Sequence, residues 1–232
     1  MPILTKTKND AAATEQRIDF SITASGIHRT YNPVAMKSMQ LRRINAFDLG
    51  LVALGAALNV SVGYLVSVLK LPLYLDSIGT ILISVLCGWQ YGLIVGLSAL
   101  LILAVTAAPT VIAYAGTALI IAVLSSFLAR VGFLKSFGAT VFGGLLVGIA
   151  ATAASVPVTT LLYGGVTLAG SDAITTIFKA TGFSLWKSVL FGSLITDSAD
   201  KLITAFICMM MIRSLPKNML SRIQKIDTIR NT

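Results

Sequence analysis

The stretch Thr181–Arg213, TGFSLWKSVLFGSLITDSADKLITAFICMMMIR, decides the fold of this chain. It is long and apolar enough to cross a bilayer as a helix, which takes about 20 predominantly apolar residues. Four charged residues nevertheless lie in its interior: Lys187, Asp197, Asp200 and Lys201. A charge near the bilayer centre costs at least about 2.5–3.5 kcal/mol, so such side chains normally face protein or a water-filled cavity. The stretch therefore predicts an inward-facing helix of a membrane protein.

The intramembrane charge cluster, Asp197, Asp200 and Lys201, has two interpretations. Residues three and four apart share one face of a helix, so Asp197 is expected beside both other members. The cluster is then either a structural group of ion pairs that fixes the packing of the last helix, or part of the wall of a polar cavity inside the bundle. Both interpretations place this helix in the interior of a helical bundle.

The composition excludes a soluble globular protein. Hydrophobic residues make up 56% of the chain and charged residues 12%, with a mean hydropathy of +0.86, whereas soluble domains carry about 25% charged residues. Of the eighteen Lys and Arg residues, seven lie in the first 45 positions and five in the last 20. This placement is typical of cytoplasmic flanks of a membrane domain and of attraction to anionic lipid, not of nucleic-acid binding.

The hydrophobic pattern predicts an all-α integral membrane domain over residues 46–213, between basic cytoplasmic tails at 1–45 and 214–232. Residues 77–128 contain no charge and are too long for one span, so the domain is divided at Gly88–Gly92 and at Pro109. A loop with a short surface helix is expected at 164–182. Six spans result, at about 46–69, 73–87, 91–107, 111–130, 137–163 and 184–213.

The distribution of Lys and Arg predicts the orientation of these spans. Both tails and the Arg130–Lys135 turn fall on one side, and only Lys70 and Lys179, with Lys187 near its edge, fall on the other. The positive-inside rule then places both termini in the cytoplasm. The chain is expected to be a multi-pass protein of the bacterial cytoplasmic (inner) membrane.

Polar and aromatic residues near the external side form a candidate binding site for a small polar ring compound. A carboxylate, an ammonium, an amide and aromatic faces would provide stacking and a few directed hydrogen bonds. Structural roles remain open for several of them: a helix cap for Asp76, an interhelical hydrogen bond for Asn59, and a place in the interfacial aromatic belt for Trp186. The members are Asn59, Asp76, Thr80, Tyr114, Trp186 and Lys187.

Motifs for catalysis, metal binding or cofactor binding are missing from the sequence. The chain has one His and two isolated Cys, and neither a P-loop nor a hydrolase arrangement occurs. We therefore expect no enzyme activity, no metal and no cofactor in this chain, and ATP hydrolysis only on a partner.

Small residues recur every fourth position on the first span and at the start of the third. Such stripes let helices approach closely in lipid, either within the bundle or against another membrane subunit. The stripe of the first span is Ala53, Ala57 and Ser61, and that of the third is Gly88, Gly92 and Gly96.

Several of these motifs together resemble the substrate-binding S components of energy-coupling factor (ECF) transporters. The first span carries Ala53-Leu-Gly-Ala-Ala57. The run Leu71-Pro-Leu-Tyr-Leu-Asp-Ser-Ile-Gly-Thr80, followed by Gly88-Trp-Gln-Tyr-Gly92, is similar to the Pro-x-x-Leu-Asp-x-Ile-Gly-Thr and Gly-x-x-x-Gly pattern of that family. The pairs Trp186-Lys187 and Asp200-Lys201 fit the same group, and the resemblance covers roughly residues 46–213.

The resemblance implies a membrane-embedded subunit that binds a vitamin or another micronutrient. Its partners would be a membrane coupling subunit, met through Ala53 and Ala57, and two ABC-type ATPases. The substrate would lie near the external surface, beneath the connections between spans one and two and between spans five and six. Transport would involve toppling of the subunit in the membrane.

Two other functions remain open from the residues alone. A stand-alone secondary transporter could use Asp197, Asp200 and Lys201 as an ion or proton relay. A membrane sensor or assembly module would need no transport at all. Dependence of uptake on an ATPase or on an ion gradient distinguishes the first two possibilities.

Overall fold

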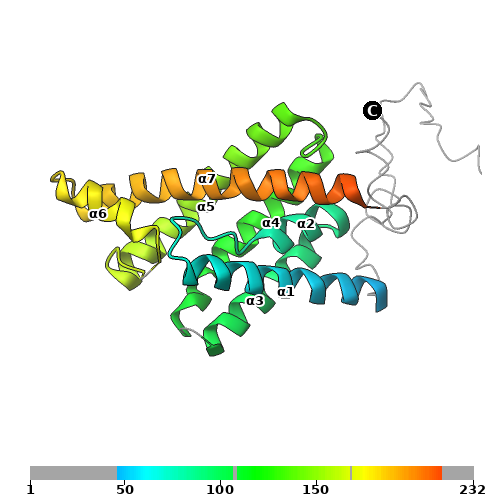
Figure 1. The fold of residues 1–232 in the computed structure, drawn as a ribbon, viewed down its shortest axis with the longest axis horizontal. Coiled ribbons are helices and arrows are strands. Elements are labelled where there is room, and N and C mark those ends of the chain that lie inside the picture. The colour runs from blue at the N-terminus through cyan, green and yellow to red at the C-terminus, as the bar shows by residue number, and fades with distance from the viewer. Residues whose placement is uncertain (1–45, 107–108, 168, 216–232) are drawn as a thin grey trace, which may run out of the picture. The chain divides into compact units, whose positions relative to one another are not determined.

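The computed structural model describes residues 46–106, 109–167 and 169–215. Within these residues every regular element is a helix, and there is no β-strand (Figure 1). The predicted basic tails, 1–45 and most of 214–232, lie outside the described residues. The elements in chain order are α1 (Ala46–Val68), α2 (Ile78–Cys87), α3 (Trp89–Thr106), the 3-10 helix η2 (Pro109–Tyr114), α4 (Ala115–Arg130), α5 (Phe137–Tyr163), α6 (Asp172–Ala180) and α7 (Leu185–Ser214).

Four helical segments in the described part of the chain are long and apolar enough to cross a membrane. They are Asp48–Val68, Trp89–Thr106, Pro109–Arg130 and Phe137–Tyr163. This finding agrees with a multi-pass membrane protein. α7 is longer, with 30 residues, but its charged interior keeps it outside this group. Six spans and the cytoplasmic position of the termini therefore stay predictions.

The second predicted span differs from the structure in length. Residues 73–77 are not helical, and α2 begins only at Ile78. With ten residues, α2 is about 15 Å long at 1.5 Å per residue, half the thickness of the hydrocarbon core. The short surface helix expected within 164–182 is present as α6, and the fifth predicted span coincides with α5.

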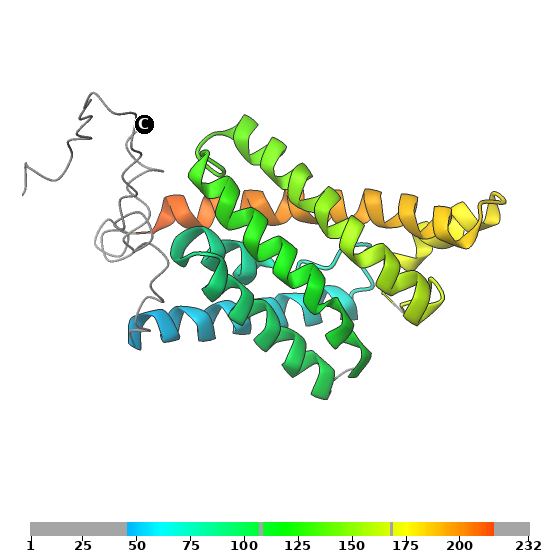
Figure 2. The ribbon, with the colours of Figure 1, turned by 180° about the vertical axis from the view of Figure 1, so that it is seen from behind.

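α2 forms the centre of the bundle. All ten of its residues are buried, and it contacts α1, α3, α4 and α7. Figures 1 and 2 show it between α1 and α7 from both sides. The close approach of α1 requires glycine, because a Cβ at Gly79 would overlap the carbonyl oxygen of Gly55. Because protein surrounds α2, the helix has no side that must face lipid or water, and its residues can be apolar all round.

α7 packs most extensively against α5. At the middle of this contact, a Cβ at Gly148 of α5 would lie 2.7 Å from the Cα of Ser198. Glycine therefore lets the two backbones meet where α7 carries its charges. At the C-terminal end of α7, Arg213 Nη2 donates a hydrogen bond of 3.1 Å to the carbonyl oxygen of Lys135, in the α4–α5 connection.

Candidate functional site

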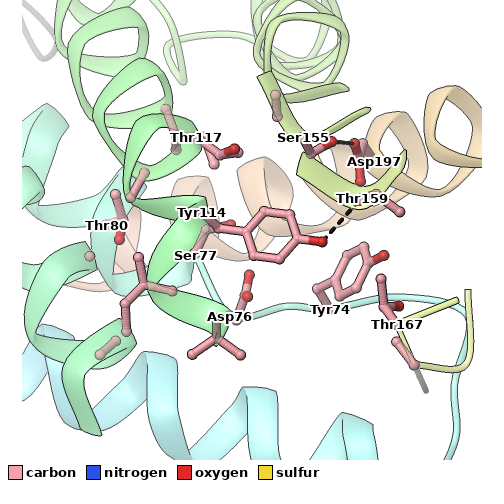
Figure 3. A pocket seen from close by; sticks show the side chains of 18 of the residues that line it. Tyr74, Asp76, Ser77, Thr80, Tyr114, Thr117, Ser155, Thr159, Thr167 and Asp197 are labelled. Carbon is pink, nitrogen blue, oxygen red and sulfur yellow. Dashed lines mark hydrogen bonds between the residues drawn. The ribbon is translucent and has the colours of Figure 1, made fainter. Parts of the chain in front are cut away.

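A partly open cavity of about 260 Å³ lies between the helices, toward the end of the bundle where α1 leads into α2. Side chains from α2, α3, η2, α4, α5 and α7 and from two connections line it (Figure 3). Apolar residues of α3 and α4 form one side, and most polar groups come from the connections, α5 and α7. The polar lining residues are Tyr74, Asp76, Ser77, Thr80, Tyr114, Thr117, Ser155, Thr159, Tyr163, Thr167, Ser193, Asp197 and Lys201.

Two chain connections meet at this end of the cavity. The α1–α2 connection approaches the α5–α6 connection so closely that a Cβ at Gly170 would overlap the carbonyl oxygen of Leu71. The hydroxyl groups of Tyr74 and Ser171 are hydrogen-bonded at 2.7 Å. Within the α5–α6 connection, the amide and the hydroxyl of Thr167 both donate to the Asp172 carboxylate at 2.8 Å. Both connections are therefore held in defined conformations beside the cavity.

Asp200 and Lys201 of α7 hold the α1–α2 connection. Asp200 Oδ1 accepts hydrogen bonds from the backbone amides of Tyr74 (3.0 Å) and Leu75 (2.7 Å). Asp200 Oδ2 pairs with the Lys201 ammonium, which also donates to Ser77 Oγ at 2.7 Å. We call this group, Tyr74, Leu75, Ser77, Asp200 and Lys201, the latch. Because α7 provides the acceptor for these two amides, Tyr74 and Leu75 can stay non-helical with their amides hydrogen-bonded.

Asp197 belongs to a different environment, although the sequence places it one helical turn from Asp200. Its Oδ2 accepts hydrogen bonds from Thr152 Oγ1 (3.0 Å) and Ser155 Oγ (3.1 Å), both on α5. No ion pair within 4.0 Å joins it to Lys201 in the described structure. Its Oδ1 receives no hydrogen bond from a described residue, although the side chain is 6% exposed and lines the cavity. The predicted cluster is thus divided into a latch and a cavity-facing carboxylate.

Asp76 is the second carboxylate on the cavity wall. It lies in the α1–α2 connection, directly before Ser77 of the latch, and no other described residue donates a hydrogen bond to its side chain. Burial raises the pKa of the Asp76 carboxyl above its usual range, and the Lys201 ammonium acts in the opposite direction. The site therefore disfavours a charge on Asp76 unless a cation approaches it.

Three tyrosines provide aromatic faces in the cavity. The rings of Tyr114 and Tyr163 are stacked with centroids 5.8 Å apart, and the Tyr114 hydroxyl is hydrogen-bonded to Thr159 Oγ1 at 2.9 Å. Burial raises the pKa of Tyr74, so this residue remains a neutral phenol. Two polar atoms of the lining, Tyr163 Oη and Thr117 Oγ1, are buried without a hydrogen-bond partner among the described residues.

The structure brings together three of the six residues predicted to bind a ring compound: Asp76, Thr80 and Tyr114. Asn59 lies next to them without lining the cavity. It connects α1 to α2, since its Nδ2 donates to Thr80 Oγ1 (2.9 Å) and its Oδ1 accepts from the Gly79 amide (2.6 Å). The interhelical hydrogen bond considered for Asn59 is therefore present.

Trp186 and Lys187 lie apart from the cavity. Both are exposed in the first turn of α7, and the Trp186 side chain is 49% exposed. Ala53 and Ala57 are exposed on α1. In contrast, the glycine stripe of α3 faces inward, because a Cβ at Gly92 would overlap the Ser84 side chain of α2.

Several polar residues of the wall were not predicted from the sequence. On α5, Ser155, Thr159 and Tyr163 line the cavity at intervals of four residues. This spacing places them on one helical face, so the stripe could have been recognised in the sequence. Tyr74 lies in the quoted Leu71–Thr80 run, where its aromatic ring was also a visible signal.

Metal ligands are not clustered in this site. The residues that the structure describes contain no group of three or more His, Cys, Asp or Glu side chains able to hold a metal ion. The arrangement instead offers two carboxylates, one ammonium, three phenols and several hydroxyls around one cavity, which suits the binding of a small organic molecule. Comparisons of this chain with protein-family models, with curated proteins and with solved structures gave no match.

Proposed function

We propose that this chain is the membrane-embedded substrate-binding subunit of an ECF-type transporter for a vitamin or similar micronutrient. One observation carries the proposal. A partly open cavity with both apolar and polar lining residues lies beside the meeting point of the α1–α2 and α5–α6 connections. The motif resemblance implies a substrate beneath these same two connections. The cavity also gives a specific place to Asp76 and Thr80 of the Leu71–Thr80 run.

The exposed small residues of α1 are the proposed contact with the coupling subunit. Ala53, Ala57 and Ser61 are exposed and recur every four residues, so they form one smooth stripe along the helix. A partner helix can approach such a stripe closely and gain van der Waals contact in lipid. Energy for transport would come from two ABC-type ATPases bound to that coupling subunit.

The binding half of this proposal is tested by native mass spectrometry of the purified full-length protein. We expect a small molecule to remain bound through purification from cells. Tyr114→Ala removes an aromatic wall and should release this molecule, whereas Tyr64→Ala alters an exposed tyrosine of α1 and should retain it. A protein that carries no small molecule under these conditions, or loses it equally in both variants, contradicts a built binding site.

The coupling half is tested by uptake into liposomes. Substrate accumulation should require co-reconstituted coupling subunit, ATPases and ATP. Ala57→Leu should reduce uptake and leave binding intact, because it adds bulk on the exposed stripe and Ala57 is not among the residues that line the cavity. Ala153→Leu adds the same bulk at an exposed position of α5 and serves as the matched control. Equal uptake by both variants would exclude the α1 stripe as the coupling contact.

A stand-alone secondary transporter is the second candidate function. It is favoured by one observation: Asp197 and Lys201 both line the cavity, and Asp200 forms an ion pair with Lys201. Such a series of ionisable groups could move a proton or an ion. Uptake driven by a proton gradient in liposomes that contain this chain alone would establish this function and reject the ECF proposal.

A further inference from the structure

We infer that the cavity selects an organic cation: a single ring with short substituents that carries one positive charge. The inference rests on the proposed function, in that it specifies the substrate class of the same site. It adds the charge of the substrate, which neither the motif resemblance nor the composition specifies.

The first argument is the balance of charge around the cavity. Three carboxylates, Asp76, Asp197 and Asp200, surround one ammonium, Lys201. Within the latch, Lys201 forms an ion pair with Asp200, and both side chains make further hydrogen bonds. Asp76 and Asp197 are left facing the cavity without a cationic partner within 4.0 Å. When these carboxylates are ionised, the wall carries more negative than positive charge, and burial disfavours this charge on Asp76 until a cation binds.

The second argument is the free hydrogen-bonding capacity of these two carboxylates. Asp197 is about nine-tenths buried, and its Oδ1 is turned to the cavity side without a donor, while its Oδ2 is held by Thr152 and Ser155. Asp76 receives no hydrogen bond from another described residue. A carboxylate removed from water without a compensating charge is costly, and the cost increases in a membrane interior. A bound cation removes this cost, whereas a bound anion increases it.

The third argument concerns the shape and walls of the cavity. A cavity volume of about 260 Å³ is at the small end for ligand pockets and suits one ring with short substituents. The stacked pair Tyr114 and Tyr163 presents electron-rich faces that attract a cation in a desolvated site. Apolar side chains from α3, such as Leu100 and Leu103, cover the opposite side. These features suit an organic cation better than a bare metal ion, which needs several oxygen or nitrogen ligands around one point.

Three probes with the same ring test the inference: benzylammonium, benzyl alcohol and benzoate. Their binding is measured by isothermal titration calorimetry on the full-length protein in nanodiscs of phosphatidylcholine, a lipid without net charge, with empty nanodiscs as blank. We expect benzylammonium to bind at least about tenfold more tightly than benzyl alcohol, since charge-assisted hydrogen bonds are stronger than neutral ones. Benzoate is expected to bind most weakly. Equal binding of all three probes, preference for benzoate, or no binding of benzylammonium would overturn the inference.

Substitutions then assign the charge preference to the two cavity carboxylates. Asp197→Asn and Asp76→Asn should each weaken benzylammonium binding by about tenfold and leave benzyl alcohol unchanged. Asp197→Glu, which keeps the charge, should restore the preference. Asp48→Asn is the matched control, because Asp48 lies in the first turn of α1, about 30 Å along the helix from the connection. Loss of preference in Asp48→Asn, or its persistence in the Asp76→Asn/Asp197→Asn double variant, would contradict the assignment.

The two proposals fail independently in these experiments. Selective benzylammonium binding without ATPase-dependent uptake would refute the transporter proposal and leave the cation-selective cavity in place. Uptake that needs the coupling subunit and ATPases, together with a co-purified neutral or anionic compound, would refute the cation inference and leave the transporter proposal in place.

Discussion

The latch and the cavity wall contain the same kind of side chain, one helical turn apart on α7, in different surroundings. Asp200 accepts hydrogen bonds from two backbone amides and pairs with Lys201. Asp197 accepts hydrogen bonds from two hydroxyls on one oxygen and presents the other to the cavity. A carboxylate with both oxygens engaged by protein donors holds a structure together, whereas one with an oxygen left without a donor is available to a ligand. This difference separates stability from binding within a single helix.

Removal of the latch carboxylate is expected to produce the largest effect. Asp200→Ala leaves the Lys201 ammonium buried without its partner and the amides of Tyr74 and Leu75 without their acceptor. Loss of one member of a buried ion pair costs about 3–5 kcal/mol. We expect a decrease of this size in the free energy of unfolding, measured by denaturation with sodium dodecyl sulfate in mixed micelles. If Asp200→Ala is as stable as the native protein, the latch does not hold the connection.

A variant in which both partners of the ion pair are neutral tests whether Asp200 and Lys201 stabilise the protein as a pair. In Asp200→Asn/Lys201→Met, neither member of the ion pair is left charged without the other, so the double variant should be more stable than the sum of the two single losses predicts. Side chains in direct contact show interaction energies of about 0.5–3 kcal/mol. A double-mutant cycle with the same unfolding assay measures this energy. Strict additivity would mean that the two charges do not act as a pair.

Asp197→Asn should affect stability less than either change in the latch. The amide oxygen of asparagine can still accept hydrogen bonds from Thr152 and Ser155, so the α5–α7 contact is retained. We expect a loss of at most about 1 kcal/mol in the free energy of unfolding, the usual net value of one hydrogen bond. A loss as large as that of Asp200→Ala would place Asp197 in the structural framework and weaken its role as a ligand group.

The smallest effect is expected at Trp186. Its side chain is exposed and does not line the cavity, so Trp186→Ala should change the free energy of unfolding by less than about 0.5 kcal/mol. Affinity for benzylammonium, measured by calorimetry, should also be unchanged. Weaker binding in this variant would mean that the first turn of α7 reaches the ligand, as the sequence alone predicted.

The sequence was a good guide to the bounds of the two longest helices in the described structure, α5 and α7. α5 has the predicted bounds, and α7 differs from the predicted sixth span by one residue at each end. These segments are long and apolar, and the requirement for internal hydrogen bonding in lipid leaves helix as the suitable conformation. The same logic failed for residues 73–77, where the amides of Tyr74 and Leu75 donate to a carboxylate more than 120 residues away. The local sequence pattern around residues 73–77 contains no information about such a distant hydrogen-bond acceptor.

For the candidate site, composition and spacing identified residue types but not their neighbours. Asp76, Thr80 and Tyr114 were chosen as polar or aromatic residues near one membrane surface, and all three line the cavity. Trp186 and Lys187 were chosen for the same reason and lie outside it. Helical periodicity specifies only which residues share a face, so it cannot distinguish a face toward the cavity from one toward lipid when both are mixed in character.

By itself, the sequence determined that the described part of the chain is a helical domain with membrane-spanning character, because hydrophobicity and length act locally along each segment. It also determined that charged groups lie inside the bundle. Only the tertiary structure decided how those charges are used. The α1–α2 connection provides the backbone amides that donate hydrogen bonds to Asp200. α5 provides hydrogen-bond donors to only one of the two carboxylate oxygens of Asp197. That division arises from contacts between distant segments, whose geometry depends on the packing of the whole bundle.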